Sequence, residues 1–319
     1  MKLAILPEEK ERIRSFLASL DLKYNNQDYS FYVEDGGRII ATVSVKGNII
    51  QGFGIAPDRR GENLAGMMIS ELINFLYEKK IHHLKVYTKP ENSEIFQALG
   101  FSEIIRTENI LLLENPPGTI WNVLNGLKKE YNVVEEDVGC AVLNANPFTL
   151  GHRYLVETAS QRHQRFLVFV LEEDLSFFKY KDRIRLVREG TADLANVTVL
   201  PSSPYLVSAL TFPTYFLKKD VDEVAEQALC DALIFEKYFL PVFGIKMRYL
   251  GTETDPVTLK YNQALERVLG EKLTIIRRRE AETVTISASL VRKLLQEKDF
   301  AALEKLVPKT TLDFLKSYE

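Results

Sequence analysis

The sequence has few of the features that mark secreted, membrane or general nucleic-acid-binding proteins. Its two cysteines, Cys140 and Cys230, belong to no Cys-x-x-Cys pair, which gives no support to a disulfide framework or a structural zinc site. No apolar run approaches the roughly 20 residues that span a bilayer, and the start of the chain turns acidic too early for a signal peptide. The 41 basic and 44 acidic residues leave a net charge of −3, without the positive excess of a general nucleic-acid binder. We therefore expect a cytoplasmic protein with no membrane and no nucleic-acid partner.

Enough apolar sequence is present for two domains. The 319 residues are 46% hydrophobic and 27% charged, and a typical domain has about 100–200 residues. The run Asn115-Pro116-Pro117-Gly118 interrupts the pattern of strands and helices. We predict a mixed α/β domain over residues 1–113, a connecting helix and linker over 114–135, and a second domain over 136–319.

The first domain begins with a pattern typical of antiparallel sheet. Apolar and polar residues alternate around Asp35-Gly36-Gly37-Arg38, which predicts a hairpin. An amphipathic helix is expected from Leu64, because apolar residues recur there at spacings of three and four. The predicted strands occupy residues 31–33, 39–45, 49–55, 84–88, 101–105 and 110–113, and a second helix is predicted over 93–99.

Strands and helices alternate along the second half, which predicts a parallel, doubly wound sheet. In such a sheet ligands bind beyond the carboxyl ends of the strands. The expected strands lie at 138–143, 166–171, 197–200, 247–250 and 273–277. Helices are expected from residue 151, through 181–188, from 212 to 240, around 262, and from the last strand to the end of the sequence.

The first strand of the second half leads into a loop suited to phosphate. Val138–Leu143 is followed by Asn-Ala-Asn-Pro-Phe-Thr-Leu-Gly-His, residues 144–152, where a helical pattern begins. Helix N-termini present unpaired N–H groups and the positive end of a dipole, and Gly151 lets a ligand approach the backbone. Thr149 and His152 lie on one face of the first turn and can both contact a transferred group. For the loop alone, an ordinary Asn-Pro turn with His152 on the surface remains an alternative.

A second segment has the same character. Ile286-Ser-Ala-Ser-Leu-Val-Arg292 opens a late helix, and hydroxyls at a helix start with an arginine one turn further on can bind an anion. A simple N-cap with a surface Arg292 is the alternative. Together the two segments predict a nucleotide site, in which positioned donors stabilise charge on phosphate oxygens and no covalent nucleophile is required.

Both segments resemble known motifs. Thr-x-Gly-His at 149–152 with Ile-Ser-x-Ser-x-x-Arg at 286–292 resembles the nucleotidyltransferase superfamily. The stretches 144–152, 178–183, 190–199 and 211–216 more narrowly resemble the citrate lyase ligases. This resemblance implies an acid-thiol ligase that joins acetate to ATP as acetyl-AMP, with release of pyrophosphate. It also implies transfer of the acetyl group to the thiol prosthetic group of the citrate lyase acyl carrier subunit, with release of AMP, and Mg²⁺ is expected to bridge phosphate oxygens.

The resemblance also implies roles for individual residues. His152 would contact the α-phosphate, with Thr149 standing where many relatives carry a first histidine. Lys181, at a helix start, would be a phosphate-binding cation, with a solvated helix charge as the alternative. Glu253 would line the adenosine pocket or be a loop acid with no ligand. The full set expected to bind ATP is Asn144, Asn146, Pro147, Phe148, Gly151, Gly251, Thr252, Glu253, Ile286, Ser287, Ser289 and Arg292.

The first domain resembles the GNAT acyltransferases. Arg60-Gly61-Glu62-Asn63-Leu64-Ala65 is similar to their pyrophosphate loop, and residues 92–101 fit their closing segment. Asn63 stands where the family has its central glycine, and asparagine adopts left-handed dihedrals more readily than most residues. The resemblance implies that Arg60, Gly61, Asn63 and Ala65 hold a coenzyme A-like arm. Our hypothesis is that this arm belongs to the acyl carrier.

Two other functions remain open at this point. One is an adenylyltransferase of the coenzyme A or NAD biosynthesis type, which keeps the adenylyl group on its product. The other is a regulatory nucleotide-binding module without turnover, which ATP would stabilise without releasing pyrophosphate.

Overall fold

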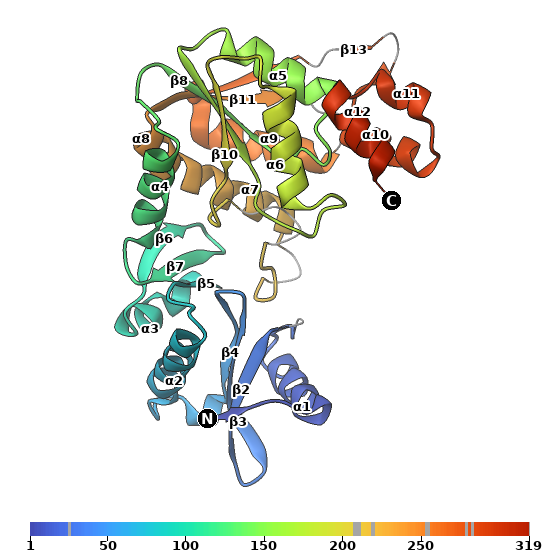
Figure 1. Cartoon of the computed structure of the whole chain (residues 1–319). Coiled ribbons are helices and arrows are strands. Elements are labelled where there is room, and N and C mark those ends of the chain that lie inside the picture. The colour runs from blue at the N-terminus through green and yellow to red at the C-terminus, as the bar shows by residue number, and fades with distance from the viewer. Residues whose placement is uncertain are drawn as a thin grey trace. The chain divides into compact units, whose positions relative to one another are not determined.

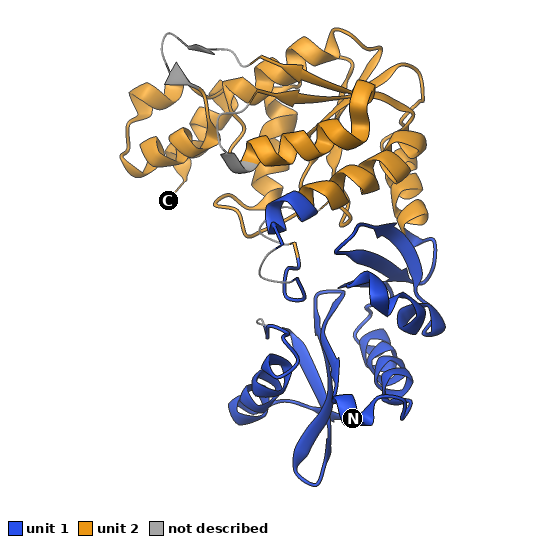
Figure 2. Cartoon of the chain, turned by 180° about the vertical axis from the view of Figure 1, so that it is seen from behind, with its two compact units in different colours: residues 1–119, 213–226 blue, residues 120–212, 227–319 orange. Residues whose placement is uncertain are grey.

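The computed structural model in Figure 1 forms two compact units, coloured separately in Figure 2. It describes residues 1–24, 27–206, 212–217, 221–252, 256–277, 280–281 and 284–318. Unit 1 consists of residues 1–119 and 213–226, and unit 2 of residues 120–212 and 227–319. Residues 213–226 therefore group with unit 1, although the sequence pattern assigns them to the second domain.

Unit 1 combines helices with a mixed sheet, which agrees with the mixed α/β class predicted for the first domain. Its strand order is β1-β2-β3-β4-β5-β7-β6, with β4 and β5 parallel and the other pairs antiparallel. Side chains of β3 and α2 supply much of the core, among them Val43, Met68 and Leu72. The elements are β1 (Lys2–Leu3), α1 (Pro7–Ala18), β2 (Tyr29–Asp35), β3 (Arg38–Lys46), β4 (Ile49–Ile55), α2 (Leu64–Glu78), β5 (Leu84–Thr88), α3 (Ser93–Ala98), β6 (Ser102–Arg106) and β7 (Leu111–Asn115).

Strands β4 and β5 pair over only two residue positions, Ile49 with Lys85 and Ile50 with Val86. A buried tyrosine also links these two strands. The hydroxyl of Tyr215 lies 3.0 Å from the carbonyl oxygen of Ile50 and 2.9 Å from that of Tyr87, and can donate to either. These contacts explain why residues 213–226 belong to unit 1, because buried carbonyl groups need donors.

Unit 2 contains the predicted parallel sheet, with strand order β10-β9-β8-β11-β12. The elements up to the last sheet strand are α4 (Thr119–Glu130), β8 (Val138–Leu143), α5 (Leu150–Ser160), β9 (Arg165–Val170), α6 (Tyr180–Gly190), β10 (Val197–Pro201), α7 (Glu223–Ile234), α8 (Leu240–Phe243), β11 (Ile245–Gly251), α9 (Pro256–Leu269) and β12 (Leu273–Ile276). After β12, a short pair of strands precedes three helices that lie together at the C-terminal end in Figure 1: β13 (Glu280–Ala281), β14 (Val284–Thr285), α10 (Ala288–Gln296), α11 (Phe300–Glu304) and α12 (Lys309–Ser317).

The fold class predicted from the sequence is confirmed, with one local error in the second half of the chain. The pattern predicts helix from residue 212, but residues 212–217 are not helical and α7 begins at Glu223. Two causes are visible: Pro213 disfavours a helical residue before it, and the side chain of Tyr215 is held by strand carbonyls. Among the described residues, no helix is long and apolar enough to cross a membrane.

Candidate nucleotide site

A cavity of about 290 Å³ lies where the carboxyl ends of β8 and β11 diverge. These two strands are the switch point of the doubly wound sheet, because the chain runs outward from β8 through β9 to β10 and then crosses to β11 and β12. Ligands of such sheets bind at this place. The lining residues come from the ends of β8, β11 and β12 and from α5, α9 and the start of α10: Val142, Leu143, Asn144, Thr149, Gly151, His152, Tyr154, Leu155, Leu171, Arg248, Tyr249, Leu250, Gly251, Thr258, Tyr261, Asn262, Ile276, Arg277, Ile286, Ser287 and Ala288.

Two arginines shape the loop after β8. Arg183 Nη1 donates to the carbonyl oxygen of Asn144 at 2.6 Å and to its side-chain oxygen at 2.8 Å. Arg292 Nη1 donates to the carbonyl oxygen of Asn146 at 2.5 Å. Burial lowers the pKa of both guanidinium groups from the ordinary value, by removing water from around the charge. The loop that precedes α5 is therefore held by charged donors from α6 and α10.

Thr149 and His152 fix each other at the start of α5. Thr149 is the N-cap, and its Oγ1 accepts from the backbone N–H of His152 at 3.3 Å. In return, His152 Nδ1 accepts from the backbone N–H of Thr149 at 3.1 Å. A neutral imidazole that accepts at Nδ1 carries its proton on Nε2. The ring also stacks on Phe148, with centroids 5.9 Å apart, so its orientation is constrained on a second side.

The second predicted segment meets the first. A Cβ atom added to Gly151 would lie 3.5 Å from the carbonyl oxygen of Ile286, so the backbone of α5 approaches the strand end before α10 closely. Ser287 caps α10, where its Oγ accepts from the N–H of Leu290 at 3.1 Å. The starts of α5 and α10 therefore face one cavity, and both can present backbone N–H groups to an anion.

The structure brings part of the predicted site together. Seven predicted residues line the cavity: Asn144, Thr149, Gly151, His152, Gly251, Ile286 and Ser287. Seven others do not, namely Asn146, Pro147, Phe148, Lys181, Thr252, Ser289 and Arg292. Of these, Phe148 is fully buried, Lys181 is exposed on the first turn of α6, and the exposed Ser289 accepts from Arg292 Nη2 at 3.2 Å. Glu253 lies outside the described residues, and the roles of all these residues remain predictions.

Sequence reasoning missed several residues of this site. Arg183 is completely buried, yet one of three arginines in an amphipathic helix is expected to be a surface charge. Arg248 and Asn262 also line the cavity without belonging to any motif recognised in the sequence. Arg277, the last residue of the strand expected at 273–277, is exposed and also contributes to the cavity wall. For Arg248, an available signal was a charged residue enclosed by apolar and aromatic neighbours, Met247 on one side and Tyr249 and Leu250 on the other.

Unit 1 has a cavity of about 400 Å³ beside the divergent ends of β4 and β5. Arg60 contributes to its wall, together with aromatic side chains that include Phe53, Phe96 and Tyr215. Asn63 is the N-cap of α2 and has φ 55°, so the left-handed conformation expected at this position is present. Gly61, Asn63 and Ala65 are not among the lining residues.

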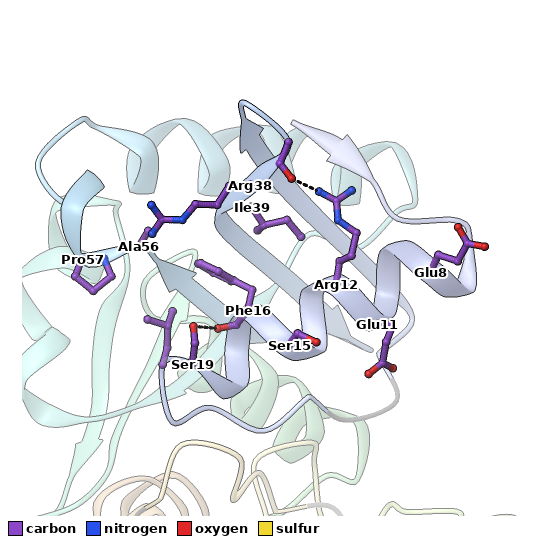
Figure 3. Close-up of a pocket in the computed structure, with 12 residues that line it drawn as sticks. Glu8, Glu11, Arg12, Ser15, Phe16, Ser19, Arg38, Ile39, Ala56 and Pro57 are labelled. Carbon is purple, nitrogen blue, oxygen red and sulfur yellow. Dashed lines mark hydrogen bonds between the residues drawn. The ribbon is translucent and has the colours of Figure 1, made fainter.

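A groove of about 590 Å³ lies beside α1 in unit 1 (Figure 3). Its arginines already have partners. Arg12 donates to the carbonyl oxygen of Gly37 and to Glu34, and Arg38 makes two 3.0 Å contacts with the carboxylate of Asp58. No residue predicted to act in catalysis or binding lines this groove. Volume therefore does not identify the reactive site here, and the smaller cavity at the β8–β11 switch point is the better candidate.

The fold and the cavity define a two-unit α/β protein with a candidate ligand cavity in its parallel-sheet half. Residues 138–315 match the family model described as citrate lyase ligase C-terminal domain. The citrate (pro-3S)-lyase ligase of Haemophilus influenzae is 37% identical over 95% of this chain and 94% of its own length. That of Escherichia coli K12 is 37% identical over 96% of this chain and 90% of its own length. This chain belongs to the citrate lyase ligase family and is an enzyme of the ligase class.

A solved structure with a related fold is a putative nicotinate-nucleotide adenylyltransferase from Vibrio parahaemolyticus. It covers 56% of this chain and 98% of its own, with 19% identity and a TM-score of 0.36. These values are too low to assign an activity to this chain.

Proposed function

We propose that this enzyme activates acetate with ATP and transfers the acetyl group to the thiol prosthetic group of the citrate lyase acyl carrier subunit. The single observation that carries the proposal is that His152, Gly151 and Ser287, from two motifs far apart in the sequence, line one cavity. Two relatives that match nearly the whole chain are named as ligases of citrate lyase, which supports the same activity.

The first step forms a mixed anhydride. A carboxylate oxygen of acetate attacks the α-phosphorus of ATP, the bond from that phosphorus to the bridging oxygen breaks, and pyrophosphate leaves. His152 Nε2–H donates to a nonbridging oxygen of the α-phosphate, while the N-termini of α5 and α10 and Ser287 face the outer phosphates. In the second step the carrier thiolate attacks the acetyl carbonyl carbon, and AMP leaves with the bonding electrons.

Mg²⁺ is part of the proposal as the partner of the triphosphate. Among the described residues no group of three or more His, Cys, Asp or Glu side chains could hold a metal ion by itself. Mg²⁺ often binds through one or two carboxylates and substrate phosphates, so a dedicated protein cage is not required. The ion would enter with ATP and neutralise its charge. The cytoplasmic location expected from the sequence remains a prediction.

Product analysis tests the activity directly. With ATP labelled in the α-phosphate, we expect labelled AMP and unlabelled pyrophosphate as products. Sustained release of both should require acetate and the thiol-bearing carrier together. A panel of short acids in the same assay would measure acyl specificity. A stable product that keeps the adenylyl group would instead indicate an adenylyltransferase. Stabilisation by ATP without any pyrophosphate release would indicate a regulatory module.

We also propose that unit 1 holds the coenzyme A-like arm of the carrier. Arg60 combines a positive charge with a position on the wall of the 400 Å³ cavity, whose other walls include Phe53 and Ile95. Such a cavity suits a chain with an anionic phosphate at one end and an uncharged body. The loop from Gly61 to Ala65 precedes α2, whose N-terminus adds unpaired N–H groups.

Calorimetry with the full-length chain tests the arm site. We expect coenzyme A, used as the probe, to bind the wild type and to bind Arg60→Glu about tenfold more weakly, because the variant repels the phosphate. Lys79→Glu, on the opposite end of α2, makes the same charge change and should bind as the wild type does. Absence of coenzyme A binding by the wild type, or an equal loss in both variants, would contradict the proposal.

A further inference from the structure

Asn262, a buried polar side chain in the nucleotide cavity, has no hydrogen-bond partner among the residues that the structure describes. Asn262 on α9 is 7% exposed and lines the cavity, and its amide makes no hydrogen bond to another described residue. Its side chain offers one acceptor oxygen and two N–H donors. A ligand in the cavity can pair with these groups, and one hydrogen bond of this kind contributes about 0.5–1.5 kcal/mol. A largely buried amide in the wall of a cavity, without a partner among the described residues, is therefore placed to hydrogen-bond to a ligand.

The wall that carries Asn262 is fixed by a buried network. Arg248 on β11 and Asp231 on α7 are 1% and 3% exposed. Arg248 Nη1 and Nη2 lie 3.4 and 3.3 Å from Asp231 Oδ2, and Nη2 donates to the hydroxyl of Tyr261 at 3.2 Å. The Tyr261 hydroxyl in turn donates to the same carboxylate oxygen. The residue before Asn262 is therefore tied to two other elements, which limits the positions that the amide can take.

The charge of this wall favours an uncharged ligand group. The guanidinium of Arg248 is neutralised by Asp231 and packs over the ring of Phe235 at 4.3 Å, so Arg248 does not present an unpaired positive charge to a phosphate or a carboxylate. The phosphate-binding features lie elsewhere in the cavity, at the starts of α5 and α10. The group that reaches Asn262 and the partly buried ring of Tyr261 is then the base of the nucleotide.

We propose that Asn262 reads this base and selects adenine over guanine. An amide pairs with adenine through two hydrogen bonds, because adenine places an amino donor next to a ring-nitrogen acceptor. Guanine presents two adjacent acceptors on one edge and N–H donors on another, which one amide matches less well. The inference rests on the proposed function, since it requires a nucleotide in this cavity.

Binding of ATP and GTP to the full-length chain, measured by calorimetry, tests this assignment. Asn262→Asp replaces the donor by a second acceptor, which can pair with the two adjacent N–H groups of guanine. We expect ATP to bind about tenfold to hundredfold more weakly, and the ATP-to-GTP affinity ratio to fall by at least about tenfold. Gln263→Glu is the matched control, because it makes the same amide-to-carboxylate change at the next residue, which is exposed. Its affinity ratio should equal that of the wild type.

Asn262→Ala gives a second readout without a new charge. We expect it to lose preference for ATP while its thermal unfolding stays close to that of the wild type. If ATP binds the wild type but Asn262→Asp and Asn262→Ala weaken ATP and GTP equally, or leave the ratio unchanged, base selection by Asn262 is wrong and the proposed function stands. If neither nucleotide binds the wild type, the nucleotide site and the assignment of Asn262 are both wrong.

Discussion

His152→Ala is expected to lower the rate of acetate-dependent pyrophosphate release by about a hundredfold or more, with only a modest loss of ATP affinity. Removal of one preorganised donor that acts on charge developing in the transition state typically lowers kcat by about 10²–10³. The structure gives the reason for expecting this donor to be well placed. Nδ1 accepts from the backbone of Thr149, and the ring stacks on Phe148, so the Nε2 proton is held in one orientation.

Two variants of Thr149 separate positioning from folding. Thr149→Ser keeps the hydroxyl that caps α5 and should retain most of the activity. Thr149→Val removes the hydroxyl, and we expect an intermediate loss of rate because the cap and one restraint on His152 disappear. Steady-state pyrophosphate release and equilibrium ATP binding distinguish the effects on kcat and on affinity. Unchanged turnover in His152→Ala would refute the role of the imidazole.

Arg183→Met is expected to lower the free energy of unfolding by about 3–5 kcal/mol, because it breaks a buried charge network. Arg183 is completely buried and donates to the carbonyl oxygens of Asn144, Glu173 and Phe178. The Glu173 carboxylate, 3.5 Å away, would lose its counter-charge. Urea denaturation followed by circular dichroism measures the change. Any folded fraction should also turn over slowly, since the loop after β8 loses one of its two arginine contacts.

Arg185→Met is the matched control on the same helix. The side chain of Arg185 is 47% exposed, and its contacts with Asp182 and Glu189 are both 3.5 Å long. Exposed pairs of this kind contribute about 0–1 kcal/mol. An Arg183→Met variant that unfolds within about 1 kcal/mol of the wild type would show that the carbonyl groups and Glu173 find other partners.

Much of the fold could be predicted because its signals are local. The two-residue period of residues 29–55 and the alternation of strands and helices after residue 138 both correspond to elements of the structure. Where a long-range contact competes with local preference, prediction fails. Residues 212–217 read as helix, but Tyr215 hydrogen-bonds to carbonyl groups more than a hundred residues away in sequence, and the segment belongs to unit 1.

The sequence by itself determined the two α/β patterns, the helix expected from residue 151, the late helix opened by residues 286–292, and the motifs that place the chain among the citrate lyase ligases. These features depend on residues that are close in the sequence, so their spacing can be taken directly from the sequence. Only the tertiary structure decided that Gly151 approaches Ile286, that Arg183 is buried while Arg185 is exposed, and that Asn262 lines the cavity without a hydrogen-bond partner in the described part of the chain. The physical reason is that the burial and the hydrogen-bond partners of a side chain depend on which distant segments pack together. Side-chain type and local periodicity do not specify that packing.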